Sequence, residues 1–445
     1  MIGYPANADY GLAIFVWAVA NWMYPIITPY VVGFIGMAVA FFIVPLSTVF
    51  SGFSNSVFWV IVGSYFIAVA FMKSNLARRV GLYLVRLGSG SVLGALLATT
   101  WANTIFSPVV MSNTARGGLF APITAGVADA FGSKPGDNKG GKAIFLANTF
   151  INVLNTNWVL TALSTNLLAL GFFTQTFNMS ISWVKWLLLS FPMLVTVALV
   201  PFIVYQMFPP TTKETSEAKM SVKHYADEEL NKMGPLSSVE KRAMAFFVLI
   251  LALFIAISFT TIDLAFVAVL AMILAVMPPF EIVTPKDALN YVEWGVVLWL
   301  GAAISIGSIG ASTGVFKALT QLIFVKSGIV AVPVTLFVIL LVLIMMYFHA
   351  ISPGYVAYTV ALVPITLEMV KAVHFANPAL LGFLVIFTMG AGAAFFPFNS
   401  APNLFFYGYG YYNEREFLKG GLVLSVITIL NILLLFFLWW PLVGI

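Results

Sequence analysis

The segment 109–120, VVMSNTARGGLF, places four polar or charged side chains between apolar runs. Ser112, Asn113 and Thr114 belong to the residue types that cap helix N-termini, where unpaired N–H groups and a partial positive charge favour anions. Arg116 follows within one turn, and its planar guanidinium is suited to pair with a carboxylate. We therefore predict that these four side chains bind an anion. The alternatives are a simple helix cap and an arginine whose charge reaches the membrane surface.

No acidic side chain is expected at the depth of Arg116. Asp263 and Glu293 fall near the ends of predicted membrane spans, and Glu368 lies near the outer end of a predicted hairpin. An arginine inside a membrane normally faces a partner or an aqueous cavity. We therefore expect the partner of Arg116 to be a bound anion.

Three further polar breaks interrupt apolar segments and repeat the pattern. Backbone breaks are tolerated at membrane depth only where the backbone is buried in protein or lines a cavity. The residues predicted to bind the anion at these breaks are Ser164, Thr165 and Asn166, then Ser352, Pro353, Gly354 and Tyr355, and finally Ser400, Ala401, Pro402 and Asn403. If the helices that restart after all four breaks point inward, their N-termini converge on one positive site for a small multivalent anion.

Enzymatic chemistry is not expected from this sequence. It has no Cys and only 3 His, and these lie far apart in the chain. A metal cluster or a nucleophile–base pair would need such residues close together. His349 could titrate near neutral pH and couple transport to protons, but we expect a hydrogen-bonded structural histidine.

The composition defines an all-α polytopic membrane protein. Hydrophobic residues make up 61% of the 445 positions and charged residues 8%, whereas soluble domains carry about 25% charged residues. Apolar runs of about 20 residues, long enough to cross about 30 Å of hydrocarbon, recur along the chain. About ten spans are predicted, near 10–27, 29–48, 56–72, 143–176, 180–208, 240–258, 261–278, 292–312, 377–410 and 417–443.

Two apolar blocks, 90–131 and 329–373, are broken in the middle and are predicted to be re-entrant helical hairpins. Two spans, 143–176 and 377–410, are predicted to be interrupted helices. The predicted organisation is therefore N-terminal scaffold helices at 1–55, a first repeat at 56–208, a cytoplasmic linker at 209–239 and a second repeat at 240–445.

Charge and internal similarity predict that the two repeats are inverted. Most of the 21 Lys and Arg residues share one side in this topology, which marks that side as cytoplasmic and both termini as extracytoplasmic. The segments 58–84 and 293–319 resemble each other, and Pro122 of the first hairpin corresponds to Pro364 of the second. Inverted repeats are typical of secondary transporters, whose substrate binds between the halves at the broken helices.

The chain resembles the divalent anion:sodium symporter family over roughly residues 10–443. The resemblance is carried by SNTA at 112–115, PITAGVADAFGSKPGD at 122–137 and SAPNLFFYGYGYYNEREF at 400–417. SNTARGG looks most like the citrate/succinate and oxoglutarate/malate exchangers of that family. The resemblance implies a homodimer in which a transport domain with both hairpins moves as an elevator against a scaffold. It also implies di- or tricarboxylate substrates such as succinate, malate, fumarate, oxoglutarate or citrate.

The chain departs from this family in its second hairpin. Gly354-Tyr355-Val356 stands where a second Ser-Asn-Thr would be expected. In sodium-coupled members both Asn-bearing tips hold Na+, so the departure and Arg116 together favour sodium-independent exchange. The alternatives are a sodium-coupled dicarboxylate symporter, with a remnant Na+ site at Ser112 and Asn113, and an organic-anion channel.

The charge distribution and the first apolar run indicate which cofactors and which membrane to expect. No cofactor is expected apart from this Na+, and the net charge of +5 requires no nucleic-acid partner because the basic residues follow the topology. The first apolar run lacks a basic segment before it and a cleavage site after it, so we expect a retained helix in a prokaryotic inner membrane.

Overall fold

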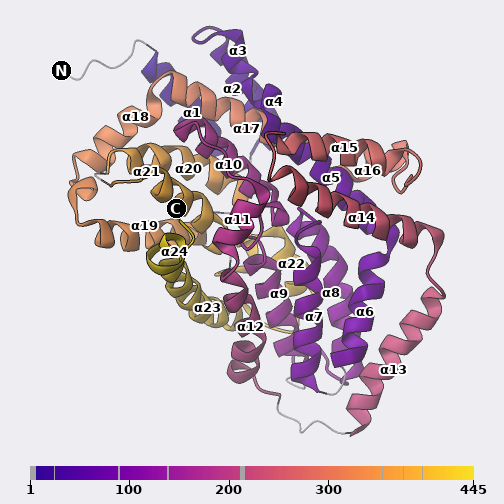
Figure 1. The fold of residues 1–445 in the computed structure, drawn as a ribbon. Helices are drawn as coiled ribbons and strands as arrows, with labels where there is room; N and C mark the ends of the chain where they lie inside the picture. The colour runs from indigo at the N-terminus through magenta and orange to yellow at the C-terminus, as the bar shows by residue number, and fades with distance from the viewer. Residues whose placement is uncertain are drawn as a thin grey trace.

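The described residues of the computed structural model form helices and connecting loops, with no strand among them (Figure 1). The description omits residues 1–6, 25, 89–90, 138–139, 211–215, 353, 374, 393 and 445, and the side chains of 216–221, 323–324, 330 and 391–392. The predicted all-α class is therefore confirmed.

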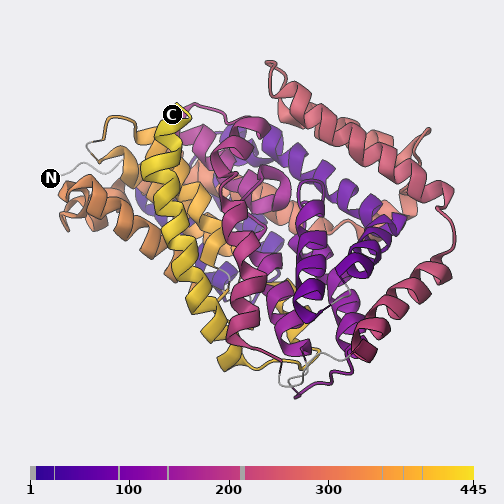
Figure 2. The ribbon, with the colours of Figure 1, turned by 60° about the horizontal axis from the view of Figure 1, so that its bottom comes forward.

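The N-terminal helices pack against a long helix from the second half of the chain. These helices are α1 (Ala8–Met23), α2 (Pro29–Ala40), α3 (Leu46–Val49) and α4 (Ser51–Ser54), and their partner is α17 (Trp294–Ser312). A side chain at Gly52 would collide with the carbonyl oxygen of Gly301, so glycine permits this close approach. Helix α5 (Ser56–Ser74) packs against α15 (Leu264–Val276), and α14 (Ser238–Ile257) lies beside α15 at one edge of the molecule (Figure 2).

Each predicted hairpin contains two α-helices with a short break between them, and in the second hairpin the 3₁₀ turn η4 (His349–Ile351) directly follows the first helix. The first consists of α7 (Val92–Phe106) and α8 (Asn113–Ala130), and the second of α19 (Val334–Phe348) and α20 (Tyr355–Lys371). Pro122 follows the first residue of α8 by the same number of residues as Pro364 follows the first residue of α20.

Each predicted interrupted helix restarts through the same backbone geometry. The first contains α9 (Gly141–Leu154), the 3₁₀ turn η1 (Leu160–Ala162) and α10 (Ser164–Phe177); the second contains α21 (Pro378–Thr388), η6 (Pro397–Asn399) and α22 (Ala401–Tyr407). Leu163 before α10 has φ −149° and ψ 133°, and Ser400 before α22 has φ −149° and ψ 131°. The two breaks are therefore local structural equivalents.

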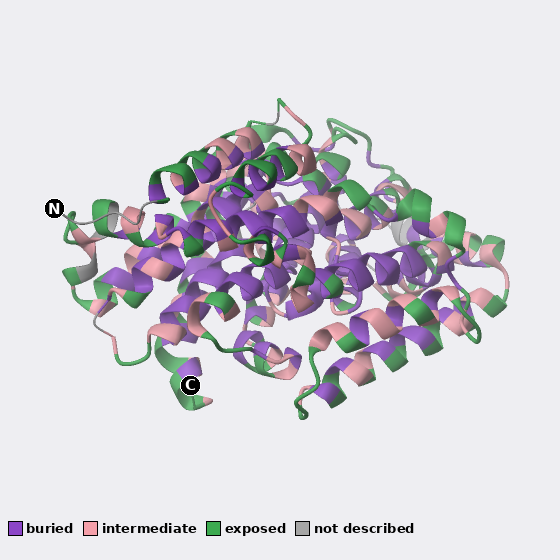
Figure 3. Cartoon of the chain, turned by 90° about the horizontal axis from the view of Figure 1, so that it is seen from above, coloured by how far each residue is buried: buried purple, intermediate pink, exposed green. Residues whose placement is uncertain are grey.

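Four helices among the described residues are long and apolar enough to cross a membrane, namely α5, α17, Val334–Ile351 and Glu414–Leu442. A fifth span would join α11 (Trp183–Ser190) to α12 (Met193–Met207) across a bend of 50°. Shorter apolar helices overlap the predicted spans 29–48, 143–176, 261–278 and 377–410. The number of spans therefore stays a prediction. Large apolar side chains such as Phe42 and Phe259 are exposed on the outside, while buried residues fill the interior (Figure 3).

The predicted hydrophilic linker contains a helix, α13 (Ser216–Met233), which lies along α6 (Leu76–Gly88) and contacts α8 (Figure 1). Arg78 and Arg86 of α6 pair with Glu229 and Asp227 of α13. The linker is therefore attached to the outside of the first hairpin through α6.

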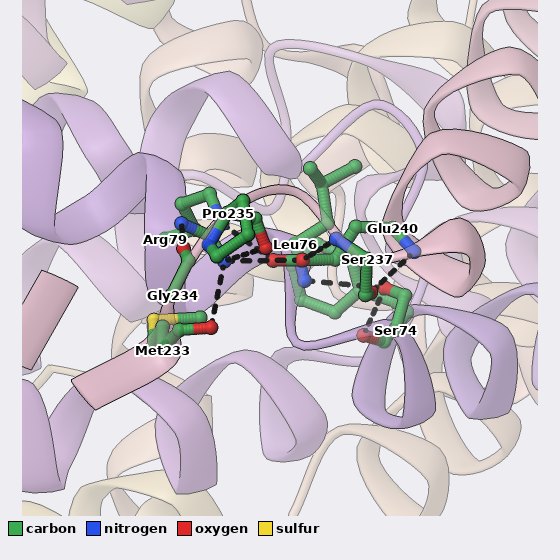
Figure 4. A network of polar contacts seen from close by, with 9 residues as sticks. Ser74, Leu76, Arg79, Met233, Gly234, Pro235, Ser237 and Glu240 are labelled. Atoms are coloured by element: carbon green, nitrogen blue, oxygen red, sulfur yellow. Dashed lines mark hydrogen bonds and ion pairs between the residues drawn. The ribbon is translucent and has the colours of Figure 1, made fainter. Parts of the chain in front are cut away.

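A buried ion pair connects α6 to the start of α14 (Figure 4). The Arg79 Nε atom lies 2.6 Å from Glu240 Oε1, and both side chains are at most 5% exposed. Arg79 also donates to the carbonyl oxygen of Gly234 at 2.8 Å. Glu240 accepts from the Ser237 N–H at 2.8 Å and so caps α14 as well. The Glu240 carboxylate therefore neutralises the charge of Arg79 on α6 and also caps the N-terminus of α14.

Replacing Glu240 with Ala should lower the free energy of unfolding by about 3 kcal/mol, because an uncompensated buried guanidinium remains. Unfolding in mixed micelles measures the change. Asp227→Ala is the matched control: it removes an acid from an ion pair whose side chains are 46% and 35% exposed, and should cost less than about 1 kcal/mol. Equal losses in both variants would contradict this role of the buried pair.

Candidate functional site

The N-terminal residues of four helices line one cavity of about 340 Å³. The helices are α8, α10, α20 and α22, the four that restart after the breaks identified in the sequence. Their lining residues are Ser112, Asn113, Thr114, Ser164, Thr165, Gly354, Tyr355, Val356, Ala357, Ser400, Ala401 and Pro402. Helices α1, α2, α5 and α17 and their flanking residues supply Trp22, Pro29, Tyr65, Glu293, Val296 and Trp299.

A second cavity of about 380 Å³ adjoins the first and shares Tyr65, Ser112, Thr114 and Glu293 with it. It extends along α5 past Ala68 and Val69 to Met72. Because Lys73 lies at this end of α5, the second cavity leads from the four N-termini toward the side that the sequence predicts to be cytoplasmic.

Hydrogen bonds hold the tip of the first hairpin against the break before α10. The Ser164 N–H donates to the carbonyl oxygen of Met111 at 3.1 Å. The Asn152 Nδ2 atom donates to the Asn113 carbonyl at 2.9 Å, and Ser112 Oγ caps α8 by accepting from the Ala115 N–H at 3.1 Å. Two of the four N-termini are thereby fixed relative to each other.

Three polar side chains that line the first cavity have atoms without a hydrogen-bond partner among the described residues. These atoms are Asn113 Nδ2, Thr165 Oγ1 and Ser400 Oγ, and all three side chains are buried. A buried donor without a partner costs about 1–3 kcal/mol. A ligand with several acceptor oxygens would satisfy all three groups.

The positive potential at the first cavity comes from helix ends rather than from basic side chains. Among the described residues that line the first cavity there is no Lys, Arg or His. Helices α8, α10 and α20 are 18, 14 and 17 residues long, so each presents a full N-terminal partial positive charge. Because α22 has only 7 residues, its dipole adds less positive potential to the cavity than the dipoles of the three longer helices.

Arg116 lies beneath the first hairpin tip and does not line the cavity. Its side chain is 0% exposed, and its Nη1 atom donates to the carbonyl oxygens of Val110 and of Ala162, the latter at 2.8 Å. Its Nε and Nη2 atoms have no partner among the described residues. The guanidinium therefore joins the hairpin tip to the break before α10, and its direct contact with a carboxylate stays a prediction.

Asn399 has the corresponding position at the second hairpin tip, and the sequence analysis missed it. Its Nδ2 atom donates to the carbonyl oxygens of His349, Ala350 and Ser352 at 3.2, 3.2 and 3.1 Å. Asn399 precedes Ser400 as Ala162 precedes Leu163, and because alanine has no side-chain donor, comparing the two breaks gives no signal for this role.

The structure brings most of the predicted residues together. Ten of the fifteen line the first cavity, namely Ser112, Asn113, Thr114, Ser164, Thr165, Gly354, Tyr355, Ser400, Ala401 and Pro402. The four that are buried without lining it are Arg116, Asn166, Ser352 and Asn403. Pro353 lies outside the described residues.

Glu293 lies at the start of the span α17, as expected, and it also lines both cavities. One expectation about a neighbouring residue is corrected. His349 is buried, but neither ring nitrogen has a hydrogen-bond partner among the described residues. Its ring instead packs between Tyr355 and Tyr358, with centroids 4.9 and 4.8 Å away.

The described residues are all-helical and highly apolar, and paired broken helices surround one cavity, as is typical of membrane transporters. The chain belongs to the family described as the sodium:sulfate symporter transmembrane region, which matches residues 2–445. This is the divalent anion:sodium symporter family, so the predicted resemblance is confirmed.

Relatives of known name and structure extend the comparison. The L-tartrate/succinate antiporters of Shigella flexneri and of Escherichia coli K12 are each 29% identical over 405 residues, covering 89% of this chain and 81% of theirs. The YdaH transporter of Alcanivorax borkumensis superposes with a TM-score of 0.60 over 98% of this chain and 99% of its own. At 14% identity that likeness shows the fold alone.

Thr165→Val should weaken binding of the transported anion about tenfold, because the variant keeps the shape and loses one hydrogen bond to a charged group. Thr366→Val is the control, since Thr366 Oγ1 donates to the Leu362 carbonyl within α20 at 2.8 Å, outside the cavity. Competition of tartrate or succinate in an uptake assay measures the effect. Equal affinities for the two variants would remove Thr165 from the site.

Proposed function

We propose that the protein is a secondary active exchanger of dicarboxylates that works without sodium. The observation that carries the proposal is the convergence of three long helix N-termini and three unpartnered buried donors on one cavity of about 340 Å³. Such a site suits a small anion with acceptor oxygens at both ends. The named activity of the L-tartrate/succinate antiporters supports C4 dicarboxylates, with citrate and oxoglutarate as larger alternatives.

In the proposed complex, one carboxylate binds at the tip formed by Ser112, Asn113 and Thr114. The other binds near Ser400 and Ala401, with Thr165 between them. Each carboxylate then meets a helix N-terminus and one of the unpartnered donors. The helix dipoles and Arg116 supply the positive potential from outside the cavity.

Sodium independence is supported by the hydrogen bonds that the carbonyl oxygens of both hairpin tips already accept from side chains. Unwound backbone carbonyls coordinate Na+ in many transporters. Here Arg116 Nη1 donates to the Val110 and Ala162 carbonyls, and Asn399 Nδ2 donates to those of the second tip. A fixed cation and a fixed amide thus occupy the groups that would otherwise bind a coupling ion. The remnant Na+ site at Ser112 and Asn113 is the competing proposal.

Exchange follows from the charge of the empty site. A transport domain with both hairpins would cross the membrane readily when a dianion compensates its positive potential. Without the dianion, the uncompensated site would cross slowly, so one substrate would leave only as another enters. The elevator movement and the homodimer are part of this proposal.

Proteoliposomes preloaded with succinate, malate, oxoglutarate or citrate should take up labelled succinate or tartrate equally well in Na+ and in choline. Uptake should saturate, and it should fall to background when the interior is empty. A sodium gradient that drives uptake into empty vesicles would contradict exchange and favour a symporter. Non-saturating current in proportion to the driving force would indicate an anion channel.

Arg116→Ala should abolish most exchange in choline and regain part of it in Na+ or Li+. The truncation removes the fixed cation and leaves the Val110 and Ala162 carbonyls free to bind a small one. Arg116→Lys, which keeps the charge, and Arg78→Ala, an exposed arginine on α6, should both stay sodium-independent. Full activity of Arg116→Ala in choline would remove the assigned role.

A further inference from the structure

Glu293 is the one charged side chain among the described residues that line either cavity. It immediately precedes α17 and shares both cavities with Ser112 and Thr114 of the first hairpin tip. Its side chain is exposed, and no hydrogen bond or ion pair joins its carboxylate to another described residue. The proposed anion site therefore contains a free negative charge.

Among the described residues that line the two cavities, there is no Lys, Arg or His to neutralise Glu293. Lys73 at the end of α5 lies 2.6 Å from Asp287 and 4.2 Å from the ring centroid of Tyr291, so its ammonium is already engaged. Arg116 of α8 donates to backbone carbonyls beneath the tip. The other titratable groups among the described residues that line the cavities are the phenols Tyr65 of α5, Tyr291, and Tyr355 of α20, and none of them is a base that carries a positive charge.

An ionised Glu293 and a bound dianion must oppose each other. The N-termini of α8, α10 and α20 attract the dianion, while a carboxylate in the same low-dielectric space repels it. A protonated carboxyl removes the repulsion and can donate a hydrogen bond to a substrate carboxylate. Because Glu293 is exposed within the cavities, it can exchange its proton with water there.

We propose that Glu293 is a proton-binding site and that its protonation admits the dianion to the cavity. This inference rests on the proposed dicarboxylate function. The charges balance: a dianion brings two negative charges and Glu293 takes up one proton from water, so the loaded site gains one negative charge. When the dianion leaves, the proton returns to water on the side to which the cavity opens.

Calorimetric titration of the full-length protein in nanodiscs tests the proposal with tartrate and fumarate, whose carboxyl groups are both ionised near neutral pH. Titration in two buffers of different ionisation enthalpy counts the protons taken up per bound dianion. The wild type should take up close to one proton at alkaline pH, and its affinity should fall about tenfold per pH unit there. Glu293→Gln should bind with no proton uptake and with an affinity that hardly changes with pH.

Two further variants separate the outcomes. Glu368→Gln, whose acid pairs with Lys371 at 3.1 Å and lines neither cavity, should behave as the wild type. Glu293→Asp keeps a carboxyl and should retain proton uptake, so it tests the proposal if the Gln variant does not fold. Equal proton uptake by wild type and Glu293→Gln, or none by the wild type, would overturn this inference alone. No binding of either dianion by folded wild type at any pH would overturn the proposed function as well.

Discussion

The structure depends on one constraint: backbone polar groups inside a membrane must be satisfied by the protein or by what it binds. Helices α8, α10, α20 and α22 begin after breaks, and each beginning leaves N–H groups without an intrahelical partner. The first residues of all four helices line the same cavity. Under the proposed function, these N–H ends form an anion site, and a bound carboxylate would complete the hydrogen bonding that the broken helices lack.

The same breaks also leave carbonyl oxygens, and the chain satisfies these with its own donors. Arg116 donates hydrogen bonds to carbonyl oxygens at the first tip, and Asn399 donates to those at the second. Donors for an anion face the cavity, while acceptors that could bind a cation are already occupied within the protein. Under the proposed function, this separation would let a member of a family named for sodium symport work as a sodium-independent exchanger. The proposed proton site at Glu293 would make substrate binding depend on pH.

Much of this architecture could be predicted from the sequence, because Ser, Thr, Asn, Pro and Gly inside long apolar runs identify the breaks. The matching geometry of Leu163 and Ser400 follows from an internal similarity that the sequence displays. The directions in which individual side chains point could not be predicted from the sequence. Arg116 lies within one turn of the capping motif, yet whether its guanidinium points into the cavity or beneath the tip depends on how the break before α10 contacts the hairpin tip. Hydropathy placed Glu293 correctly at the start of α17, but it could not show that this helix end lines the cavities.

The proposed anion site is tested most directly by a cryo-electron microscopy structure of the protein in lipid nanodiscs with succinate or tartrate and without sodium. We expect dicarboxylate density in the cavity, within hydrogen-bond distance of Asn113, Thr165 and Ser400. We also expect that Arg116 still occupies the space between the Val110 and Ala162 carbonyls. Dicarboxylate density elsewhere, or a cavity that fills only when Na+ binds at those carbonyls, would contradict the proposed site.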